Sequence, residues 1–197
     1  PLRQRLYAAR LRLAAMAGPD AVFGWWGRGT QDSAFLSAYA YHADHLATQT
    51  LGMSLPQEHW ERLLDIYSKA HATDSLAQRA WALWMMQSMG LPTGNMSDGL
   101  IQTLAQAQSS QPGTPTGGSA PGFGPFASGT GPDTMALVVA RELARKDQLS
   151  WPEALNKPLE TAYTRLEASP ALLPQAALVW AGRRPAQGEA LIKALQM

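Results

Sequence analysis

Residues 75–90 read SLAQRAWALWMMQSMG, and this stretch decides the fold class. Asp74 or Ser75 provides a helix N-cap, and Gly90 followed by Pro92 provides the stop. Between these signals, apolar side chains fall on nearly every side of the expected helix, a pattern typical of a helix at the centre of a helical domain. We therefore expect a buried helix that other helices must surround.

Amphipathic patterns predict more helices on both sides of this stretch. The expected ranges are 1–17, about 33–48 with Asp32 or Ser33 as the cap, 57–70, 96–108, 133–147, 151–167, 171–181 and 187–196. The steps Ser54-Leu55-Pro56-Gln57 and Ser150-Trp151-Pro152-Glu153 are predicted to be capping boxes with proline in the first turn. No alternating strand pattern occurs, so the predicted fold class is all-α.

The segment 109–132 differs from its surroundings in composition. It holds seven Gly, five Pro and seven Ser or Thr among 24 residues, so we expect a long flexible loop between two halves of the chain. The two halves resemble each other at three landmarks, a Phe-Gly loop (Phe23 and Phe123), a Ser-x-Pro step (Pro56 and Pro152) and an Ala/Trp-rich helix (Trp84 and Trp180). The offset is 100 residues for the first landmark and 96 for the other two.

Repeated helical units of this kind cannot bury their apolar faces alone and must stack on one another. Glycine- and aromatic-rich loops before inner helices are similar to those of α/α toroids, which are rings of helical hairpins. We therefore expect an α/α toroid or a partial ring, formed by residues 1–197 as a single domain. This analogy concerns the fold and carries no function by itself.

Composition excludes several kinds of chemistry. The chain has 197 residues, 46% hydrophobic and only 16% charged, with a net charge of +1 and no cysteine. The missing cysteine excludes disulfides, Cys-ligated zinc, iron–sulfur clusters and thiol nucleophiles. The balanced charge provides no overall field for nucleic acid, and no apolar run reaches the length of a membrane span. Because the chain begins at Pro1 without a leader, we expect a piece of a longer protein.

Two interpretations remain for the aromatic residues in the glycine-rich loops. Trp25, Trp26, Phe123 and Phe126 either anchor these loops by packing under them or form a partner-contact patch. Packing is the more common role for such residues, and we name all four as the candidate contact or anchoring residues.

Histidine provides the one conceivable metal site. His42, Asp44 and His45 form an H-x-D-H pattern, and the two histidines share a helix face. No third ligand accompanies them, so we expect a polar outer stripe rather than a metal centre. His59 and His71 are isolated and read as surface or capping residues. The sequence therefore predicts no catalytic residue, no metal and no cofactor.

The first half of the chain resembles a known family. Leu2 to Met16 followed by Phe23-Gly24-Trp25 is similar to a bacterial α2-macroglobulin pattern in which a helix leads into D-G-G-F-G-x-W. Residues 32–39, with the run AFLSAY, resemble its D-P-W-L-T-A-Y, and 51–57 resemble its G-Y-x-V-P-Q step. The match covers about residues 2–90, and the Ala/Leu-rich tail at 173–195 is similar to the family's helix pairs.

The resemblance implies a periplasmic bacterial peptidase trap. In that family a peptidase cuts a bait region, the protein collapses around it, and a Cys–Gln thioester on the toroid can bond to it. The implied partners are peptidases and other domains of the same protein, and any membrane tether would be a lipoprotein anchor elsewhere. This chain departs from the pattern because Ala21-Val22 replaces the Gly-Gly pair and the thioester tetrapeptide is absent.

Two alternatives to the trap remain at this point. One is a toroid enzyme, such as a terpene cyclase or a lyase, although the acidic residues are scattered singly rather than gathered in an Asp-rich motif. The other is a purely structural helical scaffold in a periplasmic assembly. A ring centre filled by Trp81, Trp84 and Trp180 would exclude the enzyme, whereas a hollow, acid-lined centre would favour it.

Overall fold

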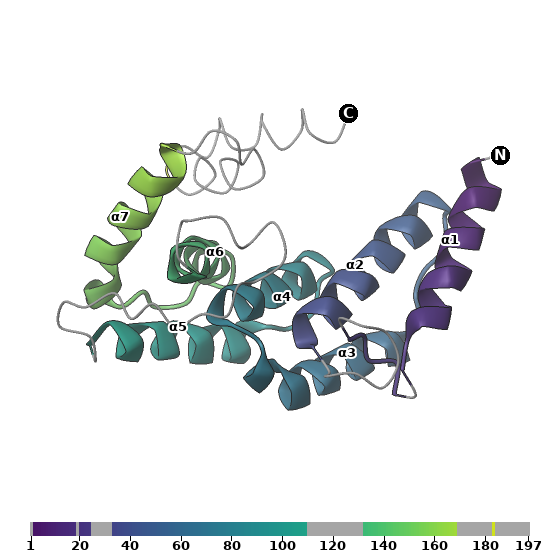
Figure 1. The fold of residues 1–197 in the computed structure, drawn as a ribbon, viewed down its shortest axis with the longest axis horizontal. Coiled ribbons are helices and arrows are strands. Elements are labelled where there is room, and N and C mark those ends of the chain that lie inside the picture. The colour runs from purple at the N-terminus through teal and green to yellow at the C-terminus, as the bar shows by residue number, and fades with distance from the viewer. Residues whose placement is uncertain (1, 19, 25–32, 110–131, 169–182, 184–197) are drawn as a thin grey trace. The chain divides into compact units, whose positions relative to one another are not determined.

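The computed structural model describes residues 2–18, 20–24, 33–109, 132–168 and 183, and within them the chain is helical without a strand. The α-helices are α1 (Leu2–Met16), α2 (Ala34–Thr50), α3 (Gln57–Ala70), α4 (Leu76–Ser88), α5 (Gly94–Ser109), α6 (Pro132–Lys146) and α7 (Asn156–Glu167), with the short 3₁₀ helices η1 (His71–Thr73) and η2 (Glu153–Leu155) (Figure 1). The all-α class is confirmed. The expected helices at 171–181 and 187–196 lie outside the described residues.

The chain divides into two compact units, Pro1–Thr93 and Gly94–Met197. In the first unit, α2 packs against α1, α3 and α4. Helix α4 carries the apolar stretch of residues 75–90, and its Ala80, Ala82, Leu83 and Met86 are fully buried. The apolar composition of this helix therefore reflects its position in the core of the unit, as predicted.

In the second unit, α6 packs against α5 and α7. Its Ala136–Ala140 run and Leu143 are buried, as are Ile101 and Leu104 of α5 and Leu159 of α7. Helices α6 and α7 lie close to the ranges expected from the sequence, 133–147 and 151–167, whereas the second unit also contains α5, which precedes the segment 109–132. The toroid and the single-domain organisation stay predictions.

Both predicted capping boxes at the Ser-x-Pro steps are wrong. The N-cap of α3 is Pro56 and that of η2 is Pro152, and neither helix has a side-chain cap. Pro56 lies at φ −61° and ψ 147°, and Pro152 at φ −62° and ψ 132°. Because the fixed φ of proline suits this extended cap conformation, proline takes the cap position and Ser54 and Ser150 lie two residues too early to serve. The helix expected over 151–167 correspondingly begins as η2 and continues as α7.

Three helices end in the same kind of turn. After α2, Gly52 has φ 71°, and the Met53 N–H donates to the Thr48 carbonyl at 2.9 Å. After α4, Gly90 has φ 85° and Leu91 donates to Met86 in the same way. These are Schellman turns, in which a left-handed residue lets the chain satisfy the last helical carbonyls.

The third such turn follows α6 and has no glycine. Gln148 takes the left-handed conformation at φ 53°, and the Leu149 N–H donates to the Ala144 carbonyl at 2.9 Å. Gln148 lies 96 residues after Gly52, the offset that also separates Pro56 from Pro152. The backbone of the α2–α3 connection therefore recurs after α6, in support of the predicted internal repeat.

Candidate partner-contact site

A largely apolar hollow of the first unit lies between α1, α2 and the start of α3. It has a volume of about 370 Å³. Aliphatic and aromatic side chains dominate its lining, which consists of Tyr7, Arg10, Leu11, Leu13, Ala14, Ala17, Ala21, Phe23, Ala40, Tyr41, Asp44 and His59. We call this hollow the α1 groove. A concave apolar surface with a few polar groups is the usual form of a binding site.

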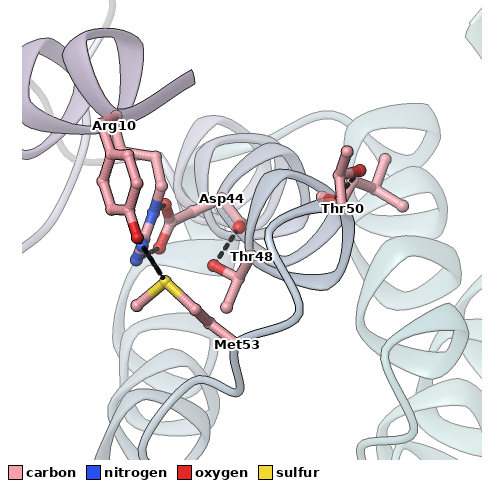
Figure 2. Close-up of polar contacts among 7 residues, drawn as sticks. Arg10, Asp44, Thr48, Thr50 and Met53 are labelled. Carbon is pink, nitrogen blue, oxygen red and sulfur yellow. Dashed lines mark hydrogen bonds and ion pairs between the residues drawn. The ribbon is translucent and has the colours of Figure 1, made fainter. Parts of the chain in front are cut away.

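An ion pair holds α1 against α2 at the rim of the α1 groove. The Arg10 guanidinium donates through Nε to Asp44 Oδ1 at 2.5 Å and through Nη2 to Oδ2 at 3.1 Å (Figure 2). This hydrogen bond with Asp44 raises the pKa of Arg10 above its ordinary value. A bidentate Arg–carboxylate pair fixes orientation as well as distance, so α1 is held in one register on α2.

The rest of α1 is weakly anchored. None of its residues is buried, and Leu2, Leu11 and Met16 are more than half exposed. The helix carries no acidic residue, and among the described residues only Arg10 of its arginines forms an ion pair. The outer side of α1 is therefore basic and partly apolar.

The back wall of the groove is fixed to the start of α2. The Phe23 N–H donates to Ser37 Oγ at 3.0 Å, and the Ser37 hydroxyl donates to the Ser33 carbonyl at 2.9 Å. The Phe23 ring meets Tyr41 edge-on at 6.3 Å between centroids. Burial raises the pKa of Tyr41, with Arg62 acting in the opposite direction.

Asp74 joins the ends of two helices. It is buried and accepts from the Ser33 hydroxyl and from the Phe35 N–H, both at 2.8 Å, so it caps α2 from a distant part of the chain. Its neighbour Ser75 caps α4 and forms a capping box with Gln78. The sequence left Asp74 and Ser75 open as the cap of one helix. The structure gives the cap of α4 to Ser75, whereas Asp74 accepts a hydrogen bond from the first turn of α2, whose own N-cap is Ser33. Burial raises the pKa of Asp74, while these hydrogen bonds act to lower it.

The histidines pack against aromatic rings. His42 meets Trp84 at 6.4 Å, His45 meets Trp60 at 5.3 Å, and His71 stacks on Tyr67 at 5.1 Å. Burial, together with His45, lowers the pKa of His42. Across the described part of the chain, no group of three or more His, Asp or Glu side chains is placed to hold a metal ion. Both His42 and His45 have a packing role that their spacing alone did not reveal.

A smaller polar cluster lies in the second unit. Glu142 is buried and its Oε2 pairs with Arg145 at 3.1 Å, whereas its Oε1 has no hydrogen-bond partner in the described part of the chain. Arg183 lies over the Tyr163 ring at 5.0 Å and pairs with Glu167 at 2.9 Å. Burial, reinforced by Glu142, raises the pKa of Tyr163 to about 12.

The four aromatic residues named from the sequence lie outside the described residues. These are Trp25, Trp26, Phe123 and Phe126. Sequence reasoning instead missed the α1 groove, whose lining comes from four separate segments. Of the residues that line the α1 groove, Phe23 alone had been singled out in the sequence as part of the Phe-Gly landmark.

No described helix is both long and apolar enough to cross a membrane. The described residues form an all-α structure with an apolar groove beside the arginine-rich helix α1. No protein-family model matches the chain, and no solved structure matches it. It is 36% identical over 182 residues to the α2-macroglobulin of Ralstonia nicotianae.

That alignment covers 92% of this chain and 11% of the relative, so the chain spans about a ninth of the relative's length. The resemblance to the bacterial α2-macroglobulin family is thereby confirmed. It extends well beyond residues 2–90, where the motifs suggested it.

Proposed function

We propose that these residues form a non-enzymatic helical part of a bacterial α2-macroglobulin-like peptidase inhibitor. The observation that carries the proposal is the 36% identity to an α2-macroglobulin along nearly the whole chain. The proposed activity belongs to the parent protein, in which a peptidase cuts a bait region and is then enclosed. The proposed site of action is the periplasm.

The proposed role of this chain is mechanical. Helices α2 and α4 have a side-chain N-cap and a hydrogen-bonded C-cap, and each unit has an apolar core in which residues such as Leu63, Leu83 and Leu143 are fully buried. A densely packed core resists deformation, so each unit would move as a body when the bait is cut. The proposed contacts are with the peptidase and with other domains of the parent protein, and the α1 groove offers one surface for them.

The ring arrangement is part of the same proposal. The recurrence of the turn at Gly52 and Gln148, and of the proline caps at Pro56 and Pro152, supports two equivalent helical units. Repeated units bury a continuous core by stacking, for which an α/α toroid is one solution.

The test uses the parent protein and trypsin. Trypsin alone and trypsin with the parent protein are each assayed on a large protein substrate and on a small chromogenic peptide. A trap slows cleavage of the large substrate and spares the small one, because the enclosed active site stays open to small molecules. Unchanged cleavage of the large substrate would refute the trap.

A further inference from the structure

Met53, in the turn between α2 and α3, lies beside two hydrogen-bond donors from α1. The Tyr7 hydroxyl donates to Met53 Sδ at 3.3 Å, and Arg10 Nη1 lies 4.0 Å from the same sulfur. Figure 2 shows the sulfur facing the Arg10 side chain, which reaches it from the neighbouring helix. Arg10 uses Nε and Nη2 for Asp44, so Nη1 is the nitrogen that remains for Met53.

A thioether sulfur is a weak acceptor, so Tyr7 and Arg10 form only weak hydrogen bonds with it. Sulfoxidation converts the methionine side chain from apolar to polar by adding an oxygen to the sulfur. An oxygen on Met53 Sδ would extend toward donors that are already in place. The Arg10–Asp44 pair keeps the guanidinium in this position before any oxidation occurs.

The Met53 residue is exposed to solvent, so peroxide can approach its side chain. Met53 is 43% exposed, whereas Met85, Met86 and Met135 are buried. Met16, at 60% exposed, is the other strongly exposed methionine in the described part of the chain, and no donor contact to its sulfur is found there. The chain contains no cysteine, so methionine is its sole sulfur residue.

We propose that Met53 is an oxidation site whose sulfoxide fastens α1 to the α2–α3 turn. Hydrogen peroxide transfers one oxygen atom to the sulfur lone pair, so that an S–O bond forms, the O–O bond breaks and water leaves. The sulfur loses two electrons and the peroxide gains them. The new oxygen accepts from the Tyr7 hydroxyl and from Arg10 Nη1. A methionine sulfoxide reductase reverses the step.

The consequence falls on the least anchored helix of the first unit. Because α1 has no buried residue, replacing two weak contacts to sulfur by hydrogen bonds to oxygen is a large change in what holds this helix. Oxidation of Met53 therefore reduces the opening of α1. This inference does not depend on the peptidase-trap proposal, since it concerns only contacts within the first unit.

The test treats the full chain with hydrogen peroxide, maps sulfoxides by mass spectrometry and measures amide hydrogen exchange in α1. We expect Met16 and Met53 to be oxidised before the buried methionines. We expect exchange in α1 to slow by about fivefold, the effect of one additional net hydrogen bond. Treatment with a methionine sulfoxide reductase should restore the original rate.

Matched variants identify the residues responsible. M16L should keep the response to peroxide and M53L should lose it. Y7F should weaken the response, because Arg10 Nη1 remains as a donor. All three variants should fold normally, as judged by circular dichroism. Three results would overturn the proposal. The first is that Met53 stays reduced at a peroxide dose that oxidises Met16. The second is that exchange in α1 is unchanged or faster once Met53 is oxidised. The third is that M53L responds to peroxide like the wild type.

Discussion

Gln148 is one of two non-glycine residues with a positive φ in the described part of the chain, the other being Ala21 at φ 58°. Gln148 is exposed and ends α6 at φ 53°, where a residue with a Cβ pays a steric cost that glycine avoids. Its counterpart in the first unit is Gly52 at φ 71°. The same left-handed turn is thus formed by glycine after α2 and by glutamine, which is strained there, after α6.

Replacing Gln148 by glycine should stabilise the second unit. We expect Q148G to raise the free energy of unfolding by about 0.5–1 kcal/mol, because relief of the left-handed strain outweighs the added entropy of the unfolded chain. The matched change G52A should cost about 1 kcal/mol in the first unit. A Cβ at Gly52 meets nothing within 4 Å, so this cost comes from the backbone alone. Urea unfolding measures both, and a destabilised Q148G would contradict the argument.

His42 is the histidine whose charge the fold disfavours. Its ring is half-buried against Trp84, and burial with His45 lowers its pKa below the ordinary value of 6.5. As pH falls below that value, the unfolded chain takes up a proton on His42 before the folded protein does. Stability contributed by the neutral ring is therefore present above pH 6.5 and is lost as the solution is acidified.

The expected result is a lower urea midpoint for the wild type at pH 5.5 than at pH 7.5, with a smaller difference in H42Q. Glutamine cannot titrate in this range but keeps a polar side chain of similar reach. An equal loss of stability in wild type and H42Q would show that other groups cause the pH dependence.

At the scale of elements, α1 depends on a single ion pair. Arg10 and Asp44 are mostly screened from solvent, with side chains 22% and 19% exposed. Removing the guanidinium leaves the Asp44 carboxylate without its partner, and the remaining contacts of α1 are made by partly exposed side chains.

We expect R10A to speed amide hydrogen exchange throughout α1 by about fivefold, while α3 and α4 keep their protection. R12A is the control, since Arg12 is exposed and forms no ion pair among the described residues. If both variants exchange equally fast in α1, the ion pair does not hold this helix.

Local signals explain why most helices could be predicted. Ser33 and Ser75 cap their helices, and the glycine at position 90 ends α4, because these effects depend on neighbours within one turn. The capping boxes at Pro56 and Pro152 were wrong because a sequence motif does not reveal which of its four residues takes the cap. The sequence also did not predict that Asp74 accepts a hydrogen bond from the start of α2, because Phe35 lies 39 residues away in the chain.

The site was harder to predict than the helices. The lining of the α1 groove is brought together by tertiary packing of α1, Phe23, α2 and His59, and no spacing in the sequence encodes that set. The contacts of the Met53 sulfur likewise join distant residues, since Tyr7 and Arg10 precede Met53 by 46 and 43 positions. The resemblance to α2-macroglobulins, in contrast, was evident from short motifs and extends along nearly the whole chain.

For the whole molecule, the missing cysteine takes on a specific meaning. If the parent protein is a peptidase trap, these residues contribute no thiol to any bond with the peptidase. Their contribution would be a stable helical body and a surface. A large protein that closes on its target needs such bodies, because closure by rigid parts transmits a local cut over a long distance.

The most direct measurement cross-links the parent protein to trypsin with an amine-reactive reagent and identifies linked lysines by mass spectrometry. Lys69, Lys146 and Lys157 are exposed and report on both units of this chain. We expect at least one of them to link to active trypsin and none to link to trypsin whose active site is blocked, since the proposed closure requires cleavage of the bait. The proposed role of this chain in the trap is contradicted if these lysines never link to trypsin that the parent protein has enclosed, or if they link equally to the blocked enzyme.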